Sequence, residues 1–293
     1  MTTTPAAPRD VAITFAGGGN RAFYQLGLLH GWGERLRPRI GGVAACGVGA
    51  CVALVWLMGR ETQTLRFWRA RRQGVRGRFE LGRLLRGQRP DPRPDVFRDT
   101  LMCAFSEDGL PKVRALPFPV LVTTAVPPRL VPAQVGTVLG IAAKTIEQRL
   151  RRDAVHPVAG RTLGFRSHVV DARECRSPKQ LTDLIIASST GPSLTRSERF
   201  GGRRLVDGGM VDDVPASVAD GIAGVRRNVV LLTRRYPASK VGDKGNRLYV
   251  APSGPSPVRR GEHARAELVD RIIEQGERDA EVHGRALRRF LVR

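Results

Sequence analysis

Short apolar runs alternate with amphipathic stretches along the chain. Residues 10–16, 118–125 and 228–233 are runs of strand length that are rich in Val, Thr, Leu and Phe, which predicts buried β-strands. Residues 22–36 carry apolar side chains at three-residue steps, which predicts a helix with one buried face. The same patterns predict further helices over residues 134–152, 177–186 and 262–293, further strands over residues 166–171, 203–207 and 247–251, and a loop over residues 187–192.

The long uncharged stretch at residues 40–59 has two interpretations. It is long enough for a transmembrane helix, which needs about 20 apolar residues. Its glycines and its β-branched start instead favour a buried strand, a turn of small residues at 45–49, and a buried helix. We take the second interpretation because it accounts for the glycines.

The turn at residues 45–49 has the spacing of a nucleophile elbow. In α/β hydrolases this elbow has the pattern G-x-S-x-G and lifts a serine above the end of the sheet on a sharp, strained turn. Here the sequence is ACGVG, so the central position is Gly47. Glycine has no side chain that could attack a substrate. A strand–turn–helix unit without catalytic ancestry would give the same local pattern.

A second glycine-rich turn, at residues 17–19, joins a predicted strand to a predicted helix. This geometry points free backbone N–H groups at an anion. One interpretation is a dinucleotide-binding loop, because Gly17, Gly19 and Ala22 fit G-x-G-x-x-G/A. The acidic residue expected about 20 positions later is missing from residues 38–46. The alternatives are an oxyanion hole, whose N–H groups stabilise charge on a carbonyl oxygen, and a tight turn without a ligand.

The net charge of the chain is unusual, whereas its hydrophobic content is not. The chain is 41% hydrophobic, which is ordinary for a globular protein, but 49 Lys and Arg against 27 Asp and Glu give a net charge of +22. A strongly cationic surface binds polyanions such as anionic lipid headgroups or nucleic acid. Arginine-rich codon usage would give the same charge without a function. Because the arginines are spread from Arg9 to Arg293, nucleic acid is the less favoured partner.

Length and cysteine usage indicate one domain over residues 1–293. A chain of this size can bury one large core, and an arginine-rich segment at residues 60–98 is expected to cover it as a cap-like insertion. The four cysteines have neither disulfide-framework nor zinc-type spacing, so we expect no metal and no cofactor. The N-terminus lacks the basic and apolar regions of a secretory signal, which makes a cytoplasmic location the default expectation.

Three motifs occur in one order along the chain: GGGNR at residues 17–21, the elbow at residues 45–49 and DGG at residues 207–209. Together they resemble the patatin-like phospholipase family over roughly residues 10–220. The resemblance implies a three-layer α/β/α sandwich around a mostly parallel central sheet. It also implies hydrolysis of lipid acyl esters by a Ser–Asp dyad without histidine.

The resemblance also assigns residues to roles. It makes Asp207 the dyad aspartate and puts Gly47 at the nucleophile position. Ala22 and Ala45 replace family glycines and are tolerable departures, whereas losing a catalytic nucleophile costs on the order of 10⁶ in turnover. The oxyanion-hole loop corresponds to Gly17, Gly18, Gly19 and Arg21.

The sequence alone identifies no other side chain that could replace the missing nucleophile. Cys46 precedes the elbow centre, Cys51 lies a turn into the predicted helix, and Ser188 and Ser189 lie outside the elbow. None has a base visible in the sequence, and a water activated by Asp207 would have only a weak base beside it.

The sequence therefore predicts a patatin-like protein that binds a lipid or acyl-ester ligand, with peripheral contact to anionic membranes. Its hydrolytic activity is lost or severely reduced at Gly47, whether by natural divergence or by deliberate substitution. The alternative is a non-catalytic module that binds anionic lipid or another polyanion. A dinucleotide-binding oxidoreductase is disfavoured by the missing acidic residue.

Overall fold

A computed structural model of the chain describes residues 8–73, 93–128, 146–147, 153–156, 159–189, 198–258 and 266–293. The strands are β1 Val11–Phe15, β2 Ile40–Cys46, β3 Val120–Val126, β4 Arg166–Asp171, β5 Glu198–Phe200, β6 Arg203–Leu205, β7 Arg227–Leu231, β8 Gly242–Lys244 and β9 Arg247–Val250. The α-helices are α1 Phe23–Leu36, α2 Val48–Met58, α3 Glu61–Arg72, α5 Arg93–Phe105, α6 Gly109–Arg114, α8 Ala159–Thr162, α9 Pro178–Ser189, α10 Ala216–Asp220 and α11 Ala266–Val292. Short 3₁₀ turns are η1 Gly19–Ala22, η2 Arg37–Arg39, η3 Ala172–Glu174, η4 Gly208–Met210 and η5 Ala238–Lys240.

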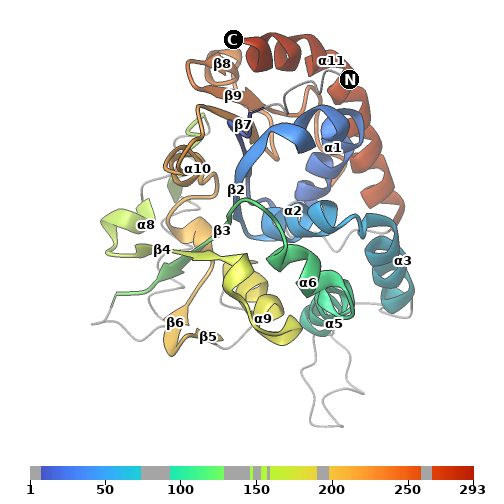
Figure 1. Cartoon of the computed structure of the whole chain (residues 1–293), viewed down its shortest axis with the longest axis vertical. Coiled ribbons are helices and arrows are strands. Elements are labelled where there is room, and N and C mark those ends of the chain that lie inside the picture. The colour runs from blue at the N-terminus through green and yellow to red at the C-terminus, as the bar shows by residue number, and fades with distance from the viewer. Residues whose placement is uncertain are drawn as a thin grey trace, which may run out of the picture.

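The central sheet has seven strands in the order β4-β3-β2-β1-β7-β9-β8. The inner pairs β3–β2, β2–β1, β1–β7 and β7–β9 are parallel, and β4 and β8 join the two edges antiparallel. Helices cover both faces, with α1, α2 and α11 on one side and α10 on the other (Figure 1). The three-layer α/β/α sandwich around a mostly parallel sheet is therefore confirmed.

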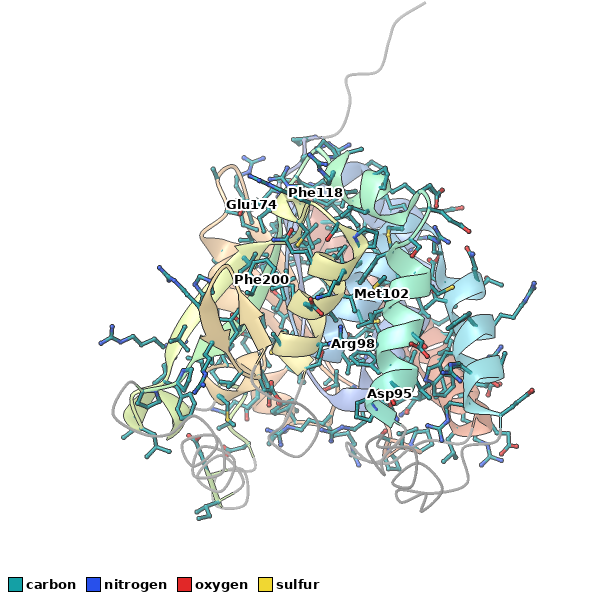
Figure 2. The ribbon with its side chains drawn as sticks, turned by 90° about the horizontal axis from the view of Figure 1, so that it is seen from below. Asp95, Arg98, Met102, Phe118, Glu174 and Phe200 are labelled. Atoms are coloured by element: carbon teal, nitrogen blue, oxygen red, sulfur yellow. The ribbon has the colours of Figure 1, made fainter. Side chains whose placement is uncertain are left out.

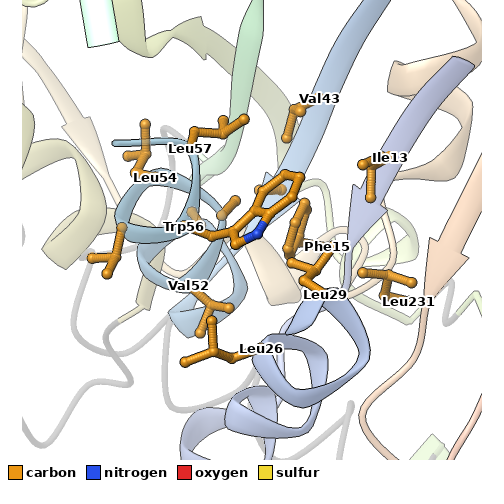
Figure 3. Close-up of a cluster of buried hydrophobic side chains, with 14 of the residues drawn as sticks. Ile13, Phe15, Leu26, Leu29, Val43, Val52, Leu54, Trp56, Leu57 and Leu231 are labelled. Atoms are coloured by element: carbon orange, nitrogen blue, oxygen red, sulfur yellow. The ribbon is translucent and has the colours of Figure 1, made fainter. Parts of the chain in front are cut away.

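The main core lies between the sheet and the helices α1, α2 and α9. Phe15, Val43 and Leu231 from three adjacent strands face Leu29 of α1 and Trp56 of α2 (Figure 3). These side chains come from the β-branched and aromatic runs that predict the strands, and from the apolar faces of the helices. The core fixes the two strand–turn–helix units, β1–α1 and β2–α2, against each other at one end of the sheet.

The uncharged stretch at residues 40–59 is the strand β2 followed by the helix α2, as its glycines predict. Gly47 separates the two elements as the N-cap of α2, and Gly59 ends the helix in the left-handed conformation. No helix in the described part of the chain is long and apolar enough to cross a membrane.

The C-terminal helix α11 packs along α1 at very short range. A Cβ on Gly276 would lie 2.2 Å from the carbonyl oxygen of Tyr24, so the two backbones can meet only where the residue has no side chain. A buried network reinforces the contact, because the Tyr24 hydroxyl donates to Asp279 (2.9 Å) and the Ser253 N–H donates to the same carboxylate (2.8 Å). The predicted apolar anchors Ile272 and Leu287 are buried in this interface.

Part of the arginine-rich segment at residues 60–98 forms the helices α3 and α5, and residues 74–92 lie outside the described residues. Helix α5 lies beside α9 (Figure 2). Arg98 of α5 forms an ion pair with Asp183 of α9 (2.6 Å), and Thr182 contacts the sulfur of Met102 (3.4 Å). These described helices pack on the α2–α9 side of the molecule.

Two boundaries differ from the sequence expectation. Helix α9 continues through Ser189, so a loop that starts at residue 187 was wrong; Ser189 bonds back to the Ile185 carbonyl (2.6 Å) within the helix. The strand expected over residues 203–207 ends at Leu205 and pairs with β5 in a separate sheet. Of the helix expected over residues 134–152, only residues 146–147 are described, and they are helical.

Candidate active site

The β2–α2 turn has the backbone of a nucleophile elbow. Gly47 adopts φ 60 and ψ −137, a region that residues with side chains rarely occupy and that costs them about 1–3 kcal/mol. A Cβ built on Gly47 would have its nearest neighbours at 3.6 Å (Ser188 carbonyl oxygen) and 3.7 Å (Gly17 Cα). Among the described residues the position therefore has room for a side chain, so crowding by them does not require glycine here.

Ser188 of α9 holds this turn in place. Its hydroxyl accepts a hydrogen bond from the Gly47 N–H (2.9 Å) and donates one to the Thr123 carbonyl of β3 (2.7 Å). The side chain is fully buried, so both bonds are shielded from water. Ser188 therefore lies against the elbow, although its sequence position suggested otherwise. Its hydroxyl is committed to two backbone groups and acts as a structural link.

The glycine loop after β1 lies beside the elbow and is held on both sides of Gly17. The Gly17 N–H donates to the Asp213 carbonyl (2.7 Å), and the Gly17 carbonyl accepts from the Thr233 hydroxyl (2.8 Å). A Cβ on Gly18 would lie 2.3 Å from the Thr233 hydroxyl oxygen, so this close approach requires glycine. Outside η1, the N–H groups of Gly18 and Gly19 donate to no backbone group in the described residues.

The helix that follows the loop anchors it to the sheet. Gln25 of α1 donates through its amide nitrogen to the carbonyls of Ala16 (3.0 Å) and Leu231 (2.8 Å), and the side chain is fully buried. Arg21 is half-buried, and its Nε is 3.4 Å from the Gly18 carbonyl, which is a weak hydrogen bond. The predicted loop residues are thus brought to the end of β1, next to the end of β2.

Asp207 reaches the same end of the sheet by a route that the sequence pattern does not show. Val206 pairs with Ala125 of β3 in an isolated antiparallel bridge, which carries the chain from the small β5–β6 sheet to the central one. Asp207 then caps η4, and its carboxylate accepts from the Gly209 N–H (2.8 Å). A Cβ on Gly208 would lie 2.1 Å from the Thr123 carbonyl oxygen, so the DGG segment packs directly on β3.

The three predicted segments meet around Cys46, the residue that precedes Gly47. The Cys46 sulfur and a carboxylate oxygen from each of Asp207 and Asp213 lie within 4.8 Å of one another. A Cβ built on Gly17 would lie 3.3 Å from the nearer Asp213 oxygen and 3.6 Å from the Cys46 sulfur. The glycine loop, the elbow and the DGG segment are therefore neighbours, and a carboxylate lies beside the strand residue that supports the elbow.

Arg234 and Tyr236, which follow β7, lie near Asp213 of this cluster. Arg234 donates to the hydroxyl of Tyr236 (2.9 Å) and to the Ala154 carbonyl (3.0 Å), and its guanidinium stacks over the Tyr236 ring at 4.3 Å. Burial raises the pKa of Tyr236. The charge and hydrogen bond of Arg234 and the charge of Arg21 act to lower it, whereas the charge of Asp213 acts to raise it. The site therefore has cationic side chains at its margin.

A second network fixes the segment that follows DGG, and sequence reasoning missed it. Asp212 is buried, accepts from the Val214 N–H (2.9 Å), and contacts Nδ1 of His156 at 3.2 Å. The other ring nitrogen of His156 is 3.1 Å from the Tyr249 hydroxyl on β9. These partners lie 56 and 93 positions from His156 in the sequence, so no local sequence pattern predicts the contacts.

The chain is similar to known proteins in both sequence and structure. A model of the family described as patatin-like phospholipase matches residues 13–220 of the chain. Among solved structures, VipD from Legionella pneumophila is similar at 12% sequence identity and a TM-score of 0.46, over 96% of this chain and 67% of that one. No curated protein matches the chain.

Proposed function

Because the chain belongs to the patatin-like phospholipase family, we propose that it binds lipid acyl esters and has lost most or all hydrolytic activity. The observation that supports the proposal is Gly47. It lies at the centre of an elbow whose backbone is intact, with φ 60 and ψ −137, and it provides no nucleophilic atom. The glycine loop and the DGG segment lie beside this turn, around Cys46, which supports the proposal.

The proposal assigns a role to each site residue. The N–H groups of Gly18 and Gly19 would act as the oxyanion donors, since the Gly17 N–H is bonded to Asp213. Gly17 and Arg21 would shape the same loop. Asp207 would act as the partner of a nucleophile at position 47.

The test is to restore the missing group. Purified wild-type protein and Gly47→Ser are compared on a chromogenic short-chain ester. Gly47→Ala is the matched control, because it places the same Cβ on the same strained backbone without a hydroxyl. We expect no significant turnover by wild type or Gly47→Ala and a clear gain for Gly47→Ser, because a nucleophile in a dyad enzyme contributes on the order of 10⁶ in turnover.

The role of the aspartate is tested in the same background. Adding Asp207→Asn to Gly47→Ser is expected to remove the gain, because the neutral amide cannot accept the proton of the serine. Rapid turnover by the wild-type chain, with no increase in Gly47→Ser, would show that this assignment of the site is incorrect. Equal gains in Gly47→Ser and Gly47→Ala would contradict it as well.

A second candidate function is supported by the net charge of +22. A protein with this charge is attracted to anionic surfaces, so a non-catalytic module for anionic lipid or another polyanion is the alternative. In either case we place the protein in the cytoplasm with peripheral contact to anionic membranes. Sedimentation with acidic and neutral liposomes tests this, with a nucleic-acid competitor to separate lipid from polynucleotide. Binding that is independent of lipid charge would argue against it.

A further inference from the structure

We propose that Cys46, Asp207 and Asp213 form a binding site for a divalent cation of the zinc type. Their ligand atoms lie within 4.8 Å of one another. Zinc takes thiolate sulfur at about 2.3 Å and carboxylate oxygen at about 2.0–2.2 Å in a tetrahedral arrangement, which places ligand atoms about 3.5 Å apart. Small rotations of the two carboxylates would bring the three atoms to that spacing and leave a fourth position for water.

The backbones that carry these ligands are already fixed. Cys46 is the last residue of β2 and pairs with Thr123 in the sheet. The carbonyl of Asp213 accepts from the Gly17 N–H (2.7 Å), and the carboxylate of Asp207 accepts from the Gly209 N–H (2.8 Å). Because the ligand positions are ordered before binding, a metal would have to order little more than side-chain torsions.

A buried hydroxyl beside the cluster is an independent indication of a ligand. The Thr123 Oγ1 is buried and has no hydrogen-bond partner in the described structure, and the residue is only 1% exposed. Thr123 is the register partner of Cys46 on the adjacent parallel strand, so both side chains leave the sheet on the same face. Gly208, which follows Asp207, packs over both residues. A buried hydroxyl without a partner destabilises the fold, and a metal-bound water would give it a partner.

The donor set selects the kind of ion. A thiolate disfavours Mg²⁺ and Ca²⁺, which prefer oxygen ligands, and suits zinc or cobalt. Binding requires loss of the thiol proton, so affinity must weaken as the pH falls. The spacing of the cysteines along the chain gives no such indication, because the three ligands come from three separate segments. This inference goes beyond the proposed function and does not depend on it.

Cobalt is the probe that reports the thiolate directly. The full chain, treated with a chelator and dialysed, is titrated with Co²⁺, and the thiolate-to-cobalt charge-transfer absorption is measured. We expect a band that saturates at one cobalt per chain and disappears when Zn²⁺ is added. Cys46→Ser should abolish the band and Asp213→Asn should weaken binding strongly. Thr123→Val should weaken it by about 10-fold, as expected for a group that orients a ligand or bound water.

Matched controls separate the site from general effects. Cys103→Ser removes a thiol on α5, and Asp99→Asn removes an exposed carboxylate that pairs with Arg71; both should keep the wild-type band. Circular dichroism of each metal-free variant checks that it is folded. A wild-type chain without the band, a band that survives Cys46→Ser, or a folded Asp213→Asn with wild-type affinity would overturn the proposal. Esterase activity is not used as a readout, so the result stands apart from the test of Gly47.

Discussion

Ser188→Ala is the most direct test of how the elbow is held. The substitution removes one oxygen atom, and with it the acceptor of the Gly47 N–H and the donor to the Thr123 carbonyl. Both backbone groups are buried at the junction of β2, β3 and α9. The change leaves the apolar part of the side chain in place, so packing is nearly conserved.

The expected loss of stability follows from these two groups. A buried backbone group without a partner costs about 1–3 kcal/mol, and two such groups would cost about 2–6 kcal/mol in a rigid structure. Because small shifts of the turn relieve part of this cost, we expect the lower half of that range, about 2–4 kcal/mol. In a chain of this size each kcal/mol lowers the melting temperature by roughly 2 °C.

The neighbouring serine is the matched control. Among the described residues, the hydroxyl of Ser189 bonds only to the Ile185 carbonyl of its own helix, an interaction that contributes little to helix stability. We expect Ser189→Ala to change the free energy of unfolding by less than about 0.5 kcal/mol. Urea unfolding of wild type and both variants, followed by circular dichroism, gives the comparison at constant m-value.

The two alanine variants distinguish the specific role of the Ser188 hydroxyl from a general effect of substitutions near the end of α9. If Ser188→Ala and Ser189→Ala lower stability equally, the hydroxyl of Ser188 does not hold the turn, and the account of the elbow is wrong. In the Gly47→Ser background, Ser188→Ala should also reduce turnover, because the serine would no longer be held in a fixed orientation.

Two further predictions concern the scaffold. Gly276→Ala should destabilise the protein by about 1–3 kcal/mol or more, because its Cβ would meet the backbone of α1. Gly284→Ala on the same helix meets only a flexible side chain among the described residues and should stabilise the protein by about 0.5–1 kcal/mol. Thermal melts measure both variants, and equal effects would contradict the close packing of α11 on α1. Burial alone would raise the pKa of Asp10, but the hydrogen bond and charge of Arg39, with the charge of Arg227, lower it. Because the folded pKa is lowered, the ionised Asp10 stabilises the fold above its unfolded pKa of about 4, and this stabilisation is lost as the pH falls through the folded pKa. Asp10→Asn should therefore be less stable than wild type at pH 7, and the difference in stability should close below about pH 4.

The strands and helices near the site were predictable because their patterns are local. The apolar run before Gly17 and the helical spacing after it define β1 and α1, and the small residues around Gly47 define the turn between β2 and α2. Each signal lies within about 15 residues, the range over which periodicity is informative.

The links between these segments were not predictable in the same way. Ser188 bonds to Gly47 across 141 positions, and Val206 reaches β3 through a single bridge rather than a strand. A hydroxyl that satisfies buried backbone groups has the same sequence signature as one in a solvent-exposed helix. The family resemblance supplied the place of Asp207, and no physical reading of the sequence would have done so alone.

The backbone of the β2–α2 turn and the glycine at its centre can be explained together. Gly49 cannot take a side chain, because a Cβ there would lie 2.5 Å from the Ala16 carbonyl oxygen, so the close approach of α2 to the end of β1 fixes the turn whatever residue stands at its centre. A side chain at position 47 would have to adopt φ 60 at a cost of about 1–3 kcal/mol, and glycine removes that strain. Gly47→Ser should therefore lower stability by the same amount as Gly47→Ala while only the serine changes turnover. Stability and activity would then be opposed at this one position.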